Sequence, residues 1–429
     1  MKLSRYAQVY PHAEDKESVI LFSAKRASAV LVPAGLVEDI EKGGLTEEER
    51  DTLTGLGLLA NSEEEEKQEM LGFIRELNDL DKTLKFTVVL NFDCNLGCKY
   101  CFEGARKGKF YLSDETADQF IDFVRRSDWS TKEAINITFY GGEPLLSTDR
   151  IAGLSEEISS FAKQKNLKFS FSLVTNGTLL TPDVVGRLAP LGLKSAKVTL
   201  DGPKEVHDSF RPFTSGKGSY DVIVRNIKDV CDLTVVQIGG NYTKDHYREF
   251  PRLLDHLMDT GITPDKVSLI KFDPVVKENG KSALPDFNDG CSSLDEPWLI
   301  DAALYLREEI LRRGYRTAGI TPSPCIIQMN SSLVVNYDGV LYKCPALIGR
   351  KNCSVGELKG GLIDCRTSHS LEAWKNEECL ACGYLPLCFG GCKYMLLLST
   401  GGMNGVNCRK RYLDRTLCGF VSQDIKYDL

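Results

Sequence analysis

The sequence predicts an α/β protein built around a parallel sheet that forms a partial (β/α)6 TIM-like barrel. The first observation is that short apolar runs alternate in regular order with amphipathic stretches through the middle of the 429-residue chain. The second is that several of these stretches open on a Ser or Thr that can cap a helix. Repeated β–α units imply a parallel sheet with right-handed crossovers. Six units give an incomplete barrel, in which functional loops follow the carboxyl ends of the strands.

Residues 1–80 precede the barrel and predict a small α/β module. The segment holds apolar runs at 19–22 and 29–32, an acidic helical pattern at 45–53 and a further apolar stretch at 56–59. An acidic run at 62–69 predicts a linker or the exposed start of a helix. Two strands and accompanying helices therefore form the expected module.

Residues 81–315 hold the six β–α units. The predicted strands are Phe86–Leu90, Ile135–Tyr140, Phe169–Val174, Ala196–Leu200, Leu233–Gly239 and Lys266–Lys271. The predicted helices between them are Ser113–Arg126, Ser147–Lys165, Thr181–Leu191, Tyr220–Val230 and His246–Gly261. The alternation is typical of a parallel sheet covered by helices.

Residues 316–429 form a third, cysteine-rich part. Seven cysteines recur in it with short spacings: Cys325, Cys344, Cys379, Cys382, Cys388, Cys392 and Cys408. The run 326–342 contains the turn sequence Asn336-Tyr-Asp-Gly339, which predicts a hairpin that carries Cys325 and Cys344 at its ends. Pairs of cysteines two or three residues apart suit either zinc or iron–sulfur ligation.

Composition narrows the classes of function. The net charge of −7 disfavours a broad nucleic-acid-binding face. No apolar stretch has the length of a membrane span, and the first residues lack the apolar core of a signal peptide, so we expect a cytoplasmic protein without a membrane partner. Fifteen cysteines in a reducing compartment indicate metal ligation, and an odd count fits poorly with a fully paired disulfide framework.

The most informative motif is Cys94-x3-Cys98-x2-Cys101, which lies directly after the first predicted strand. Cysteine thiolates ligate iron–sulfur clusters, and three of them leave one iron of a four-iron cluster without a protein ligand. A structural zinc site would need four ligands, and the nearest histidine is His207. The spacing therefore favours a [4Fe–4S] cluster with one reactive iron.

This motif, with Tyr100 before its last cysteine, resembles the signature of the radical S-adenosylmethionine (radical SAM) enzymes. The resemblance implies that the open iron binds the amino and carboxylate groups of SAM. Electron transfer then cleaves SAM to methionine and a 5'-deoxyadenosyl radical. No side chain is assigned from the sequence as the acid or base of the reaction.

Later loops resemble the SAM-binding segments of the same family. Gly141, Gly142, Glu143 and Pro144 resemble the GGEP motif, whose backbone and Glu receive the SAM amino group. Thr175 and Asn176 resemble its TNGT segment, and Thr199 stands where S-L-D-G has a serine. Arg211, in His-Asp-Ser-Phe-Arg, either holds the SAM carboxylate or is an exposed loop arginine.

The C-terminal cysteines resemble a SPASM domain, which would bring the total to three [4Fe–4S] clusters. By this resemblance Cys379, Cys382, Cys388 and Cys408 bind one auxiliary cluster, and Cys325, Cys344 and Cys392 bind the other. The fourth ligand of the second set is Cys353 or a substrate group. One or two zinc sites are the alternative.

The N-terminal module resembles the winged-helix-like element that binds the leader of a precursor peptide, by adding it as a strand at a sheet edge. A stabilising N-terminal cap is the alternative. The resemblances together imply a radical SAM SPASM enzyme that forms a cysteine thioether crosslink in a ribosomally made peptide, with a flavodoxin- or ferredoxin-type electron donor.

Other functions stay open, and one of them is a different peptide crosslink or oxidation. A sulfatase maturase, which makes formylglycine, shares nearly all these motifs, but the extra cysteine expected soon after Cys325 is absent from 326–331. A non-catalytic iron–sulfur electron carrier would need neither the GGEP loop nor a six-unit barrel. Cleavage of SAM by the reduced protein separates an enzyme from a carrier.

Overall fold

A computed structural model describes residues 1–101, 103–277, 289–322, 324–350 and 352–428. The chain forms two compact units, each made from segments that are not consecutive. One unit combines residues 1–80, 319–329 and 366–429, and the other combines 81–318 and 330–365. The division into three consecutive domains at 80 and 315 stays a prediction.

The larger unit is built on an eight-stranded sheet in the order β11-β10-β9-β8-β7-β6-β12-β13. Six consecutive strands run parallel to one another: β6 (Thr83–Val89), β7 (Ala134–Tyr140), β8 (Lys168–Thr175), β9 (Leu193–Thr199), β10 (Val235–Tyr242) and β11 (Val267–Pro274). Each overlaps one of the six strands predicted from the sequence. The predicted partial barrel is confirmed.

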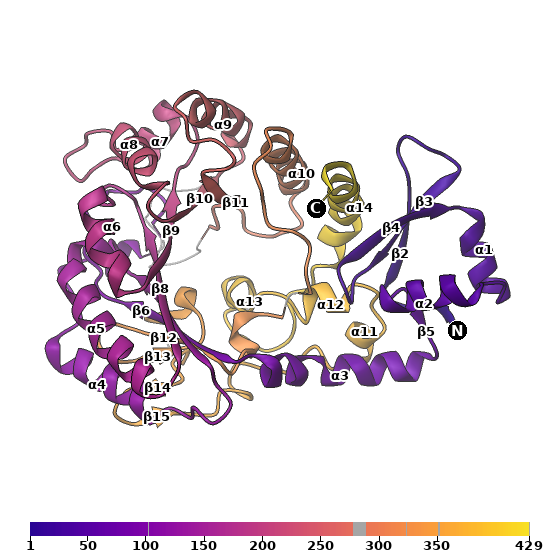
Figure 1. Ribbon diagram of the computed structural model, residues 1–429, viewed down its shortest axis with the longest axis horizontal. Helices are drawn as coiled ribbons and strands as arrows, with labels where there is room; N and C mark the ends of the chain where they lie inside the picture. The colour runs from indigo at the N-terminus through magenta and orange to yellow at the C-terminus, as the bar shows by residue number, and fades with distance from the viewer. Residues whose placement is uncertain (102, 278–288, 323, 351, 429) are drawn as a thin grey trace. The chain divides into compact units, whose positions relative to one another are not determined.

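Helices cover one face of this sheet (Figure 1). They are α4 (Asp114–Arg126), α5 (Thr148–Gln164), α6 (Pro182–Leu188), α7 (Lys204–Phe210), α8 (Tyr220–Val230), α9 (Phe250–Asp259) and α10 (Pro297–Arg312). Ile137, Phe171 and Val198 are buried on the helix-covered face. The residues that alternate with them, such as Thr138, Ser172 and Lys197, are only partly buried and lie on the opposite face, which we call the inner face.

The predicted hairpin is present and has an additional role. Strand β12 (Ser332–Val335) pairs antiparallel with β13 (Leu341–Tyr342), and the intervening turn contains Gly339 with a positive φ. Strand β12 also pairs in parallel with β6, so the hairpin extends the barrel sheet. A two-stranded ribbon of β14 (Gly356–Glu357) and β15 (Gly361–Leu362) follows. The sequence pattern did not reveal the β12–β6 pairing, because a short apolar strand carries no signal for its distant partner.

The smaller unit contains a three-stranded antiparallel sheet in the order β2-β3-β4, formed by β2 (Ala7–Pro11), β3 (Ser18–Ser23) and β4 (Ser28–Pro33). The helices α1 (Gly35–Lys42), α2 (Glu47–Gly55) and α3 (Glu63–Leu80) follow, and β1 (Lys2–Leu3) pairs with β5 (Leu59–Ala60). Thr46 caps α2 in a capping box with Glu49. Because α3 begins at Glu63, the acidic run at 62–69 is the start of a helix and not a linker.

The C-terminal segment of this unit is mainly helical. It contains α11 (Glu377–Leu380), α12 (Leu385–Cys388), α13 (Lys393–Thr400) and α14 (Lys410–Tyr427). Phe22 and Met70 from the N-terminal segment share one buried cluster with Trp374, Phe389 and Leu417. Residues 1–80 are therefore packed into one core with the cysteine-rich end. Within the described residues, no helix is long and apolar enough to cross a membrane.

A buried histidine holds the loop that follows α7. The Nδ1 atom of His207 accepts a hydrogen bond from the Asp201 backbone N–H at 3.1 Å, and its Nε2 atom lies 3.0 Å from Ser219 Oγ. Ser219 Oγ in turn donates to the Arg211 carbonyl at 2.6 Å. A Cβ on Gly218 would lie 2.2 Å from the Asp208 carboxylate, so a larger residue here would displace that side chain. His207, Arg211 and Ser219 are thus parts of one hydrogen-bonded loop.

We expect His207 to make folding sensitive to acid. Burial lowers the pKa of His207 well below its usual 6.5, so the unfolded chain binds a proton there that the folded chain does not. The free energy of unfolding should fall as the pH drops below about 6.5, by up to about 1.4 kcal/mol per pH unit for one proton. Urea unfolding of the cluster-free protein between about pH 7.5 and 5.5 measures how the free energy of unfolding changes with pH. His207→Gln should remove the part of this pH dependence that His207 contributes.

His256→Gln is the matched control, because His256 is exposed on α9. Its pH dependence should follow that of the unaltered protein. Identical slopes for His207→Gln and the unaltered protein would show that His207 does not titrate differently in the folded and unfolded chains.

Candidate functional site

The three-cysteine loop leaves the sheet at the carboxyl end of β6 and is held by backbone pairing. Gly97 and Lys99 donate backbone hydrogen bonds to the carbonyls of Pro212 and Phe210 at 2.8 and 2.9 Å. On its other side Phe92 donates to the Phe110 carbonyl at 3.0 Å. The cysteines are therefore presented by a loop that is fixed to the segment containing Arg211.

The thiols of this loop share one cationic neighbour. Burial raises the pKa of Cys94 to about 11 and also raises that of Cys101. Burial works against the charge of Lys107, but the thiolates of Cys101, Cys94 and Cys98 outweigh it and raise the Lys107 pKa. Lys107 is anchored by a 3.0 Å hydrogen bond from Nζ to the Leu96 carbonyl. An ammonium group that interacts with three thiolates suits an anionic, thiolate-ligated cluster.

Gly141 and Gly142 are required because two loops approach each other closely. A Cβ on Gly141 would lie 2.5 Å from the Asn91 carbonyl oxygen, and one on Gly142 would lie 2.4 Å from the Asp93 carbonyl oxygen. The Gly142 and Glu143 N–H groups donate to these same two carbonyls at 3.0 and 2.9 Å. The turn after β7 is thus joined directly to the residues that precede Cys94.

The carboxylate of Glu143 joins this turn to a third loop. It is fully buried, and its oxygens accept hydrogen bonds from Thr175 Oγ1 at 2.7 Å, Asn176 N at 2.8 Å and Leu145 N at 3.0 Å. Burial raises the Glu143 pKa, and these donors oppose the rise. Of roughly four acceptor positions on a carboxylate, three are taken within the protein. Glu143 therefore positions the loops, which the sequence motif alone did not indicate.

Asn176 connects the third loop to the cysteine loop. Its side-chain amide donates to Asn95 Oδ1 at 2.9 Å and lies 3.8 Å from Cys94 Sγ. Asn95 donates to Thr178 Oγ1 at 2.8 Å. Pro144 begins the short 3-10 helix Pro144–Ser147 directly after Glu143 and is buried. The predicted residues of the GGEP and TNGT segments are therefore brought together with Cys94.

Tyr100 and Arg211 lie in a second buried network. Arg211 donates to Tyr100 Oη at 2.8 Å and lies 3.8 Å from Asp201 Oδ2, which also accepts from Tyr100. Asn241 N donates to Asp201 Oδ1 at 2.7 Å. Arg211 is 8% exposed, so its interpretation as an exposed loop arginine is wrong. Its Nε atom is buried and has no hydrogen-bond partner among the described residues.

The charge of Arg211 is favoured by its surroundings. Burial works against it, but Cys98, Tyr100 and Asp201 outweigh burial and hold the Arg211 pKa well above its usual value. Burial raises the pKa of Asp201, which Arg211 opposes. Thr199 ends β9 on the inner face, two residues before Asp201. Asp201 and Asn241 were not predicted, although Asp201 stands in the T-L-D-G segment and could have been found there.

Four cysteines gather in the smaller unit. Burial raises the pKa of Cys379, and the nearby thiols of Cys388, Cys408 and Cys382 raise it further. Cys408 is distant in sequence but is placed by a backbone hydrogen bond from Asn407 N to the Gly390 carbonyl at 2.9 Å. A Cβ on Gly391 would lie 1.9 Å from the Asn407 carbonyl oxygen, which explains the glycine. The set predicted for one auxiliary cluster is therefore assembled within one unit.

The second predicted set is divided between the units. Cys325 interacts with Cys392 and accepts a backbone hydrogen bond from Lys393, at the start of α13. Cys344 lies in the larger unit, where its thiol and that of Cys101 both interact electrostatically with the buried Tyr140. Cys353 is 1% exposed and belongs to the same unit as Cys344. This ligand set stays a prediction.

The cysteine loop fits the cofactor expected for it. It offers three thiols, a nearby ammonium, and an arginine with an unpartnered Nε atom. In the described part of the chain, no three Cys, His, Asp or Glu side chains are placed to hold a single metal ion. In a four-iron cluster each thiolate binds a different iron, so the three cysteines need not converge on a single metal ion. The three thiols of the loop therefore remain suitable ligands for such a cluster.

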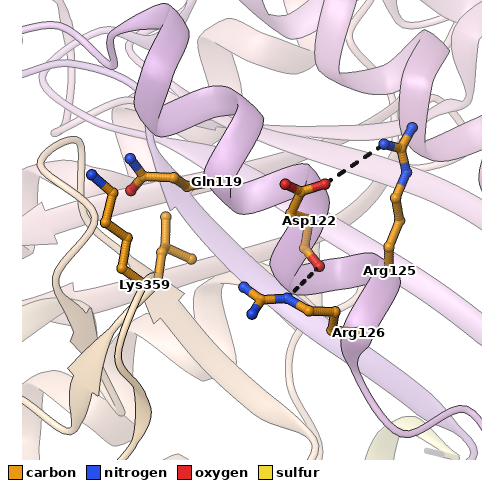
Figure 2. Close-up of a pocket in the computed structure, with 6 residues that line it drawn as sticks. Gln119, Asp122, Arg125, Arg126 and Lys359 are labelled. Carbon is orange, nitrogen blue, oxygen red and sulfur yellow. Dashed lines mark hydrogen bonds and ion pairs between the residues drawn. The ribbon is translucent and has the colours of Figure 1, made fainter.

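A pocket of about 500 Å³ lies elsewhere on the larger unit, between α4 and the β14–β15 turn (Figure 2). Asp122 and Arg125 form a 3.7 Å ion pair there, and Arg126 Nε donates to the Asp122 carbonyl at 3.3 Å. Arg125 also forms a 3.0 Å ion pair with Glu157 on α5, and Lys359 forms a 2.7 Å ion pair with Glu115 on α4, so these two charged groups of Figure 2 have partners outside their own elements. None of the motif residues lines this pocket, and we assign it no role.

Comparisons with known proteins agree with this geometry. Residues 88–254 match the Radical SAM superfamily. Fe-coproporphyrin III synthase from Methanosarcina barkeri is 28% identical over 57% of this chain and 57% of its own length, so that match spans little more than half of the relative. The cysteine-type anaerobic sulfatase-maturating enzyme of Clostridium perfringens strain 13 is 26% identical over 70% of this chain and 86% of its own. Mycofactocin maturase MftC of Mycolicibacterium smegmatis is 23% identical over 73% of this chain and 79% of its own.

Solved structures share the fold. The structure of native anSMEcpe with bound AdoMet and Kp18Cys peptide superposes with a TM-score of 0.63 at 19% identity, covering 80% of this chain and 97% of the other. Streptococcus suis SuiB bound to precursor peptide SuiA gives a TM-score of 0.55 at 16% identity, covering 95% of this chain and 98% of the other. With the parallel sheet and the three-cysteine loop, the family match identifies a radical SAM domain in residues 88–254 of this enzyme.

Proposed function

We propose that this enzyme is a maturase that forms a cysteine thioether crosslink in a ribosomally made precursor peptide. When bound, SAM and a [4Fe–4S] cluster supply a 5'-deoxyadenosyl radical that removes a hydrogen atom from a substrate carbon. The observation that carries the proposal is the joining of the loops after β6, β7 and β8 at one edge of the sheet.

Each predicted residue has a role consistent with its position. Cys94, Cys98 and Cys101 would ligate the cluster, and Gly141 and Gly142 would let the backbone approach the SAM amino group. The unpartnered Nε of Arg211 suits the SAM carboxylate, and the Thr199 hydroxyl suits another polar group of SAM. Tyr100 and Asp201 orient Arg211 through the buried network.

Two further clusters complete the proposal. Cys379, Cys382, Cys388 and Cys408 would bind one, and Cys325, Cys344 and Cys392 the other. Cys353 or a substrate thiolate would supply the fourth ligand of the second set. If a substrate thiolate binds there, metal coordination would lower its pKa and hold the sulfur for crosslinking.

Peptide recognition is proposed for the three-stranded sheet of the smaller unit. On the β2 side, Arg5 O and Gln8 Nε2 lie 3.0 Å from the position of a Cβ on Gly383, so that side is near another segment. On the other side, β4 pairs only with β3 among the described strands and exposes Leu31. An extended leader peptide could add to the β4 edge as a further strand.

A sulfatase-maturase activity is the second candidate, since such enzymes match 70% of this chain. Two features favour a leader-bearing peptide. No cysteine follows Cys325 within 326–331. The SuiB structure also matches 95% of this chain, so the shared fold must include most of the N-terminal module. We further propose a cytoplasmic location, a flavodoxin- or ferredoxin-type electron donor, and no nucleic-acid partner.

The cofactor assignment is tested by replacing Cys94, Cys98 and Cys101 together with Ala. Anaerobic reconstitution of the unaltered protein should give about twelve irons per chain, and the triple variant should lose about four. SAM cleavage by the dithionite-reduced protein should be abolished in the variant, because the remaining clusters do not bind SAM.

Cys231→Ser is the control, because Cys231 lies outside all three ligand sets and contacts the Lys228 carbonyl. It should retain full iron content and SAM cleavage. Four irons per chain with stoichiometric zinc in the unaltered protein would contradict the two auxiliary clusters. Equal SAM cleavage by the triple variant would contradict the radical SAM site.

Leader binding is tested at the sheet edge with two substitutions at equally exposed positions. Leu31 on β4 and Val9 on β2 are each 41% exposed. Leu31→Glu should weaken binding of a precursor peptide encoded beside the gene by about tenfold, because a charge enters the apolar contact. Val9→Glu should leave the affinity for the precursor peptide, measured by fluorescence-anisotropy titration, unchanged. If both variants and the unaltered protein bind the precursor peptide with equal affinity, β4 is not the docking edge.

A further inference from the structure

The inner face of the barrel sheet carries a polar layer beneath the site. Asn136 Nδ2 donates to Ser170 Oγ at 3.1 Å, between β7 and β8. Ser172 Oγ lies 2.9 Å from Ser195 Oγ, between β8 and β9. These hydrogen bonds link neighbouring strands across the inner face.

Lys197 on β9 is the charged side chain that enters this face near the site. It lies two residues before Thr199, on the same face. Among the residues that the structure describes, it makes no hydrogen bond and no ion pair. By contrast, Lys271 on β11, which is on the same face, forms a 2.9 Å ion pair with Asp273. Lys197 thus presents a cation without a partner in the described part of the protein.

The position of Gly239 on the neighbouring strand β10 shows in which direction the Lys197 side chain extends. Lys197 pairs with Gln237, and Gly239 pairs with Thr199, so Gly239 is one step nearer the carboxyl ends of the strands. A Cβ on Gly239 would lie 2.7 Å from Lys197 Cε and 3.6 Å from Nζ. The lysine therefore passes over Gly239 and extends toward the edge where the cysteine, GGEP and TNGT loops meet.

We propose that Lys197 is the receptor for a carboxylate that enters the inner face from this edge. An ammonium on a partly buried, polar surface binds a carboxylate by a charge-assisted hydrogen bond. The carboxylate belongs either to an acidic side chain of the substrate peptide, which rests on the proposed function, or to SAM, in which case Lys197 takes the role proposed above for Arg211. Both sources have the same chemistry, and the binding measurements distinguish them.

The test compares the reconstituted enzyme with four variants. Lys197→Met removes the charge, and Lys197→Arg keeps it. Gly239→Ala keeps the lysine but places a methyl group 2.7 Å from the present position of Cε; the flexible side chain can move aside, so the fold is retained. Lys271→Met is the matched control, since that lysine already has a carboxylate partner.

In the substrate arm, the probes are acetyl-aspartate methylamide and acetyl-asparagine methylamide, titrated with SAM present and followed by ligand-detected NMR. Lys197→Met and Gly239→Ala should weaken binding of the aspartate probe by about tenfold. Lys197→Arg and Lys271→Met should retain it. The asparagine probe should bind all variants alike.

In the SAM arm, equilibrium dialysis compares SAM with decarboxylated SAM. If the SAM carboxylate is the partner, Lys197→Met should weaken the binding of SAM by about tenfold and leave the affinity for decarboxylated SAM unchanged. Unchanged affinities for the aspartate probe and for SAM would overturn the proposal. SAM cleavage measured on the same samples is a separate readout: its absence in the unaltered enzyme would contradict the proposed function, not the role of Lys197.

Discussion

The buried carboxylate of Glu143 is the interaction on which the site depends. Its hydrogen bonds to Thr175 Oγ1 and Asn176 N tie the loop after β8 to the turn after β7, and the Gly142 and Glu143 N–H groups tie that turn to the residues before Cys94. Three loops from three parallel strands thus meet at one sheet edge. An unpaired carboxylate at this depth would be costly, so the loops and the carboxylate stabilise one another.

The second buried network extends this arrangement across the barrel. Tyr100 reaches from the cysteine loop to Asp201 after β9, and Asn241 on β10 joins them. Arg211 is held against Tyr100 by the loop that His207 and Ser219 support. The chain therefore fixes a cation near Cys98 through its own hydrogen bonds. Lys197 adds a second cation on the inner face, directed toward the same edge.

Much of this was predictable from the sequence, because periodicity and motif spacing are local signals. The six barrel strands and the cysteine loop at the end of β6 were predicted from such signals and are present. The pairing of β12 with β6 and the packing of residues 1–80 with the C-terminal helices were not, since both depend on distant contacts. Asn241 and Lys197 were missed for a related reason, because their roles come from unpaired or shared polar atoms that only coordinates reveal. Asp201 was missed although it stands in the T-L-D-G segment of the sequence.

The most direct test of the account is the mass of the product. The reconstituted enzyme is incubated with SAM, a reductant and a cysteine-containing precursor peptide encoded beside its gene, and the peptide is analysed by tandem mass spectrometry before and after thiol alkylation. The account predicts loss of two hydrogens and one free thiol per crosslink, together with 5'-deoxyadenosine. A peptide that gains an aldehyde in place of its cysteine, or that stays unchanged while SAM is cleaved, would contradict it.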